Sequence, residues 1–157
     1  MKYEEPNQYA LRIAKKELAT ASHLTYVTYG TIKDIKLLLP IVEHIAKAAK
    51  LALQALLEYE LSYKRIDPYA SGLQAQIDAF ESQVFRRYEF EKEHLQLLKR
   101  LNKIINAAQE AVISFKRDNR FFLSNYEMET ESIGIDDVKK YLRITKSFIG
   151  SVEKIIK

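Results

Sequence analysis

The chain of 157 residues contains no cysteine, and it has only four glycines and three prolines. Without cysteine there can be no disulfide, no thiolate zinc site and no cysteine nucleophile. Because glycine and proline are scarce and no Gly/Ser-rich linker is present, nothing marks a boundary between domains. A chain of this length can bury roughly two thirds of its unfolded surface, so we expect one domain, residues 1–157, with its own core.

Long uncharged apolar runs are also missing. A membrane-spanning helix needs about 18 such residues, and the most apolar window is interrupted by Lys36, Glu43 and Lys47, among others. The N-terminal sequence MKYEEPNQYA is too acidic and polar for a signal peptide. We therefore expect no membrane association and, given the missing cysteines, a cytoplasmic protein.

Positive charge is modest but unevenly distributed. The formal net charge is +4, and residues 86–120 hold nine Lys or Arg against five Asp or Glu, a surplus equal to the whole net charge. A phosphate-bearing partner is therefore permissible. A solvated basic face explains the same bias.

The stretch Thr31–Tyr63 is the longest apolar-rich segment, and we expect it to form the central core helix. Its polar residues recur every three or four positions, which places them on one line of a helix, with apolar residues opposite; they are Glu43, Lys47, Lys50, Gln54 and Glu58. Thr31 with Asp34 resembles a capping box. Pro40 predicts either a kink at Leu39 or a separate short turn before it.

Four further helices and one hairpin are predicted. Helical periodicity covers residues 6–29, with Gly30 as the stop, and then 72–87, 91–113 and 136–156. β-Branched and aromatic residues flank the turn-prone pair Asp118-Asn119, which predicts a hairpin. The expected fold is all-α, an antiparallel (up-and-down) bundle of about five helices with a small β-hairpin near residues 113–124.

Histidine chemistry centres on His94. His23 and His44 lie on or beside polar stripes without partners at metal-ligand spacing, so we expect them to be structural or solvated. His94 lies on an inward stripe and is preceded by Arg87. A guanidinium can clamp phosphate oxygens while an imidazole transfers the proton of an attacking hydroxyl, which is the chemistry of metal-independent RNA cleavage. The alternative is a capping or packed histidine.

No metal or cofactor is predicted. Glu91 and His94 form a Glu-x-x-His pair, a spacing that di-iron helical bundles use twice together with two further glutamates. This chain has no second pair of that kind. Glycine-rich phosphate loops are also absent, because the glycines are isolated.

Two resemblances add expectations. Arg87, Tyr88 and then His94, set among long helices, resemble the arginine, four-to-six residues, histidine signature of the HEPN superfamily. That resemblance implies a helical bundle that often dimerises around the motif. Some members are ribonucleases of toxin–antitoxin or defence systems, and others are inactive RNA-binding or partner-binding domains or companions of small nucleotidyltransferases. Separately, residues 17–45 and 114–133 resemble a group of uncharacterised archaeal helical proteins, whose activity is unknown.

A second candidate surface is the predicted hairpin, which carries Lys116, Arg117 and Arg120 among aromatic residues that include Phe122. Interleaved basic and aromatic side chains can stack on single-stranded nucleic acid and contact its backbone. Alternatively, the aromatic side chains pin the hairpin to the helices and the basic groups point to water.

Taken together, these patterns favour a non-enzymatic, HEPN-like module that binds a protein partner or RNA, and the HEPN resemblance implies a homodimer. The alternative is a metal-independent endoribonuclease in which Arg87 holds the scissile phosphate and His94 is the general acid or base.

Overall fold

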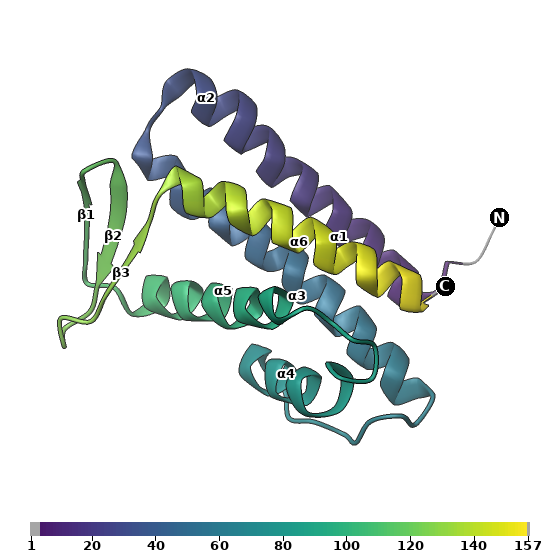
Figure 1. Cartoon of the computed structure of the whole chain (residues 1–157). Helices are drawn as coiled ribbons and strands as arrows, with labels where there is room; N and C mark the ends of the chain where they lie inside the picture. Colours follow the sequence, from purple (N-terminus) through teal and green to yellow (C-terminus); the bar gives the residue numbers. More distant parts are fainter. Residues whose placement is uncertain (1–3, 157) are drawn as a thin grey trace.

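The computed structural model describes residues 4–156, which form five helical segments and one small antiparallel sheet (Figure 1). The first segment is α1 (Pro6–His23), which continues through a π-helical turn (Leu24–Thr28) into α2 (Tyr29–Ile32). In the described residues no helix is both long and apolar enough to cross a membrane.

The end of this first segment differs from the sequence prediction. Gly30 lies inside the helix, and the left-handed residue that ends it is Lys33, with φ of 55°. The predicted capping box is also wrong, because the Thr31 hydroxyl donates to the Val27 carbonyl of the same helix at 2.9 Å. Asp34 is a cap on its own, since its side chain accepts from the Lys36 amide at 3.0 Å.

The central helix is α3 (Leu38–Ser62), preceded by a 3-10 turn (Ile35–Leu37). Of the two predictions for Pro40, the separate short turn is nearer to the structure than the kink at Leu39. The turn ends at Leu37, however, and α3 begins two residues before the proline. Pro40 is the third residue of α3, where a missing amide breaks no intrahelical bond. As predicted, α3 supplies the core; its buried residues are Leu38, Ile41, Val42, Ile45, Ala46, Ala48, Ala49, Ala52, Leu53, Ala55, Leu56, Leu57 and Glu60.

The remaining helices pack around α3. They are α4 (Leu73–Ala79), which continues as a π-helical turn (Phe80–Val84), α5 (Lys92–Glu110) and α6 (Ile135–Ile156). α1 and α6 lie beside each other and both pack on α3, while α4 and α5 cover another side of it (Figure 1). All three later helices fall within about three residues of the predicted bounds, as such assignments usually do.

The sheet joins α5 to α6 and has the strand order β1 (Ile113–Arg117), β2 (Arg120–Ser124), β3 (Thr130–Ile133). The hairpin is confirmed, and its turn residues Asp118 and Asn119 have φ of 51° and 61°. The sequence prediction missed the third strand, whose short sequence TESI lacks apolar alternation. Buried Phe121 and Leu123 attach β2 to the helices, and Phe115 stacks on Phe122.

Candidate functional site

Arg87 belongs to a cluster of side chains around Glu60, which is fully buried near the end of α3. Its guanidinium donates one bond to a Glu60 carboxylate oxygen and one to the Arg65 carbonyl, both at 2.9 Å. Arg65 and the Tyr88 hydroxyl donate to the other Glu60 oxygen, each at 3.0 Å. Burial, reinforced by this bond to Glu60, raises the pKa of Tyr88. We call Glu60, Arg65, Arg87 and Tyr88 the Glu60 cluster; it fastens the turn after α4 to α3.

His94 is enclosed rather than presented to solvent, with a residue exposure of 2%. Its ring packs against Phe90 and Phe148, with centroids 5.8 and 5.7 Å away. Nε2 lies 3.0 Å from the Ser147 hydroxyl of α6, and Nδ1 is buried without a partner among the described residues. Burial lowers the pKa of His94 against the opposing pull of the nearby acidic side chains Glu91 and Glu93, so the neutral ring predominates at pH 7.

The structure gives Arg87 and His94 separate partners. Arg87 is directed to Glu60 and His94 to Ser147, and no hydrogen bond joins the two among residues 4–156. To act on one phosphate, the arginine must give up its carboxylate and the imidazole must leave its aromatic surroundings. The endoribonuclease alternative stays a prediction, and this arrangement adds no support to it.

The other two histidines have ordinary surroundings. His23 is exposed in the last turn of α1. His44 Nδ1 lies 2.8 Å from Glu17 on α1, and this contact, followed by the smaller effect of Lys47, lowers the pKa of the Glu17 carboxyl in spite of partial burial. Both therefore have the structural or solvated character that their positions predict.

One group of side chains has the composition of a metal site. Glu91, Glu93 and His94 place one possible ligand atom each within 4.8 Å of one another. Glu91 is exposed, however, and Glu93 lies 3.6 Å from the guanidinium of Arg143, which already supplies a positive charge. Exposed carboxylates gather in this way in many proteins without an ion. The prediction that no metal is bound is neither confirmed nor contradicted by this arrangement.

The four hairpin residues proposed for nucleic-acid binding do not form one surface of free groups. Lys116 and Arg117 are exposed on β1. Arg120 is occupied, because its guanidinium donates to the Ser132 hydroxyl at 3.0 Å and to Asp137 at 2.7 Å. Phe122 is partly buried and stacks on Phe115, with centroids 5.0 Å apart. Two cations and one half-covered ring remain accessible there.

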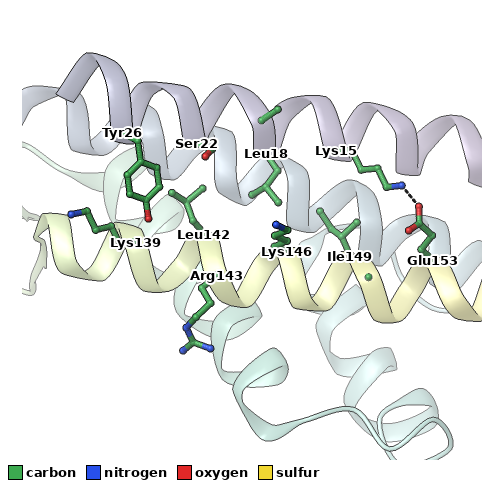
Figure 2. A pocket seen from close by; sticks show the side chains of 12 residues that line it. Lys15, Leu18, Ser22, Tyr26, Lys139, Leu142, Arg143, Lys146, Ile149 and Glu153 are labelled. Atoms are coloured by element: carbon green, nitrogen blue, oxygen red, sulfur yellow. Dashed lines mark hydrogen bonds and ion pairs between the residues drawn. The ribbon is translucent and has the colours of Figure 1, made fainter. Parts of the chain in front are cut away.

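A groove of about 690 Å³ lies between α1 and α6, at a place that the sequence predictions do not include (Figure 2). Its floor is apolar and includes Leu18, Leu142 and Ile149, and its cations are Lys15, Lys139, Arg143 and Lys146. Tyr26 and Lys139 lie at one end, and the Lys15–Glu153 ion pair lies at the other. We call this the α1/α6 groove.

A sequence signal for the groove does exist. Lys139, Arg143 and Lys146 are spaced by four and three positions, so they form one basic line along α6. The line becomes a groove wall only when α1 packs beside it, and α1 is more than a hundred residues away in the sequence. Periodicity within one helix cannot show that pairing.

The lining of the α1/α6 groove combines aliphatic and cationic side chains. Among the residues that line it, the single carboxylate is Glu153, and Lys15 holds it. No histidine is among the residues that line it. No protein-family model matches the chain, and no curated protein or solved structure matches it either.

Proposed function

We propose that the protein is a non-enzymatic, HEPN-like helical bundle that binds a protein partner, and that the α1/α6 groove takes up an amphipathic helix with acidic residues beside its apolar face. The observation that carries this proposal is the combination of an aliphatic floor with a line of cations along one wall. Lys139 and Lys146 have no carboxylate within 4.0 Å in the part of the chain that the structure describes.

The floor favours a helix as the occupant. Small residues line it at Ala19, Ser22 and Gly150, so the backbone of a bound helix can approach closely. The α1 wall runs from Lys15 to Tyr26, which at 1.5 Å per residue is about 16 Å, or three turns of a bound helix. Helices bound in grooves insert apolar side chains at i, i+3, i+4 and i+7, a span of about 10.5 Å, and one further turn to i+11 extends this to the length of the floor.

Charge selects the kind of helix. Lys139, Arg143 and Lys146 follow one wall at helical spacing, so carboxylates three or four residues apart on the partner can pair with them. The Arg143 guanidinium is directed away from α1 and lies 3.6 Å from Glu93 of α5, so Lys139 and Lys146 are the first candidates for such pairing (Figure 2). Two copies of this groove would oppose like charges, so self-association through it is disfavoured.

RNA fits this groove less well. Sequence-tolerant binding of single strands uses several aromatic platforms on which bases stack. Tyr26 is the one aromatic residue among those that line the groove, and Lys139 lies over its ring at 5.7 Å. The floor is otherwise aliphatic, which suits leucine-like side chains better than bases.

Fluorescence anisotropy with designed peptides tests the proposal. The probes are a labelled helix of about 14 residues with leucines on one face and glutamates beside them, the same helix with lysines in place of the glutamates, and a labelled single-stranded RNA. We expect the acidic peptide to bind in a salt-dependent manner and the basic peptide to bind at least about tenfold more weakly. If RNA binds more tightly than the acidic peptide, or if neither peptide binds, the proposal is wrong.

Two glycine substitutions give a matched pair. A Cβ added at Gly150 or at Gly30 meets no other atom within 4 Å, so a side chain can leave the backbone at either position without a clash at its first atom. Gly150→Trp fills the groove and should abolish peptide binding, whereas Gly30→Trp lies outside the lining and should leave it unchanged. Equal affinity of the two variants for the acidic peptide would place its binding site elsewhere.

A further inference from the structure

β1 is an edge strand with an open outer side. The strand order is β1-β2-β3, so β1 pairs with β2 alone, and every β1 residue is exposed. Two of its apolar side chains are well exposed, Ile113 at 53% and Phe115 at 41%. Exposed edges of this kind are templates for the addition of another strand.

The pairing with β2 shows which backbone groups are free. Arg117 pairs with Arg120 across the two-residue turn, Phe115 pairs with Phe122, and Ile113 pairs with Ser124. In an antiparallel pair closed by such a turn, these alternate residues direct their N–H and C=O groups to the neighbouring strand. The N–H and C=O groups of Ser114 and Lys116 therefore point away from β2.

We propose that β1 is a homodimer contact, in which two copies of the chain join their β1 strands antiparallel about a two-fold axis at Phe115. The two three-stranded sheets then form one continuous sheet. This contact is separate from the α1/α6 groove, and it does not depend on the function proposed for that groove.

The register follows from the free backbone groups. With Phe115 on the axis, Ser114 of each copy lies opposite Lys116 of the other, and these pairs exchange their outward N–H···O bonds. Ile113 lies opposite Arg117, so no like charges are opposed directly. A register shifted by one step toward the turn would instead place Lys116 opposite Lys116, which is unfavourable. The sequence ISFKR is thus complementary to itself in the register centred on Phe115.

Aromatic packing supports the same axis. Phe115 stacks on Phe122 with an interplanar angle of 3° and a centroid distance of 5.0 Å. In the proposed dimer, the two Phe115 residues form a pair without hydrogen bonds, the kind in which side chains approach most closely. Four rings, Phe122 and Phe115 from each copy, would form one row across the joined sheet and cover apolar surface that a single copy exposes.

The other edge of the sheet is less open to a new strand. On β3, the Ser132 carbonyl accepts from Arg100 at 3.4 Å and from Arg120 at 3.3 Å. Glu131 is also held by Arg100 and Lys103. Because a two-fold contact between β1 strands uses up both open edges, it closes at two copies and does not propagate into a fibre.

Cysteine trapping tests the register without interference, because the natural chain has no cysteine. In the proposed dimer the Cα atoms of the two Phe115 residues are about 4.5 Å apart, within the reach of a disulfide. Phe115→Cys should form a covalent dimer under mild oxidation. Ile113→Cys is the matched control, since its two copies are four residues out of register, about 13 Å apart, and should not be linked.

The backbone contact is tested separately by light scattering coupled to size exclusion over a range of concentrations. We expect the natural chain to dimerise, Lys116→Ala to dimerise as well, and Lys116→Pro to weaken the dimer at least about tenfold, because proline removes an outward N–H while β1–β2 bonds are kept. Circular dichroism would confirm that Lys116→Pro is folded. A monomer at every concentration, equal linking of the two cysteine variants, or a dimer indifferent to Lys116→Pro would each overturn the proposal.

Discussion

Replacing Glu60 by glutamine should destabilise the protein substantially, because Glu60 is the shared acceptor of the Glu60 cluster. Its carboxylate is fully buried and receives bonds from Arg87, Arg65 and Tyr88 at 2.9 to 3.0 Å. Removing one partner of a buried ion pair typically costs about 3–5 kcal/mol. The arginine side chains are 39% and 42% exposed, so water compensates for part of the loss. We therefore expect about 2–3 kcal/mol for Glu60→Gln.

Arg87→Gln should reduce the free energy of unfolding by less, about 1–2 kcal/mol. In that variant Arg65 still neutralises the Glu60 carboxylate, and the Tyr88 hydroxyl still donates a hydrogen bond to it. For a chain of this size, about 2–4 °C of thermal midpoint corresponds to 1 kcal/mol, so Glu60→Gln should lower the midpoint by about 4–12 °C. Urea denaturation gives the free energies, and Glu58→Gln on the exposed face of the same helix is the control, expected within about 0.5 kcal/mol of the natural chain.

The double variant Glu60→Gln/Arg87→Gln decides whether the two residues act together. Direct partners should show a coupling energy of about 1 kcal/mol or more. If the two effects simply add, or if Glu60→Gln is no more harmful than Glu58→Gln, the structural role given to Arg87 is wrong. Its guanidinium would then be free for a phosphate, and the endoribonuclease alternative would gain weight.

Three further predictions concern His94, the core and catalysis. Burial lowers the folded-state pKa of His94 below the unfolded value of about 6.5, so the unfolded state binds more protons as the pH falls past that value. Stability should therefore decrease as the pH decreases through about 6.5. The urea midpoint of His94→Gln should depend less steeply on pH in this range. A slope unchanged by the substitution would contradict this. Leu53→Asp should prevent folding because Leu53 is fully buried. His44→Ala should cost less than about 1 kcal/mol of stability, since Lys47 still pairs with Glu17. Circular dichroism and urea titration measure both effects, and loss of the fold in His44→Ala would contradict the prediction. Incubation of RNA in EDTA should give no cleavage by the natural chain, whereas robust cleavage that His94→Ala abolishes would support the enzyme instead.

The sequence predicts the elements whose hydrophobic period is long and regular. α3, α5 and α6 each repeat apolar residues every three or four positions over at least 19 residues, so their existence and approximate bounds follow from that period. The hairpin follows from local turn chemistry at Asp118 and Asn119, which tolerate the left-handed conformation that the turn needs. These features are encoded locally.

Features that depend on tertiary contact were not predictable in the same way. Gly30 is a good helix stop in isolation, yet the chain turns at Lys33, because the place where the helix ends depends on how α1 and α3 pack together. Glu60 was overlooked, although it lies on the apolar stripe of α3, four residues after Leu56. An acidic residue on the apolar side of a helix indicates a buried ion pair. Its partners Arg87 and Tyr88 lie more than twenty residues later in the sequence, so only the folded protein identifies them.

The end of α6 lies against the start of α1, and the sheet stands at the opposite end of the helices (Figure 1). Ile156 lines two hollows together with Gln8, and one of these is also lined by Leu11, so the two ends of the described chain are neighbours. The backbone is therefore nearly a closed ring. A short linker between these ends, with a new opening in the exposed loop near Asp67, should give a circular permutant that keeps the packing of α1, α3 and α6. The order in which the helices are synthesised is then separable from the contacts that hold them together.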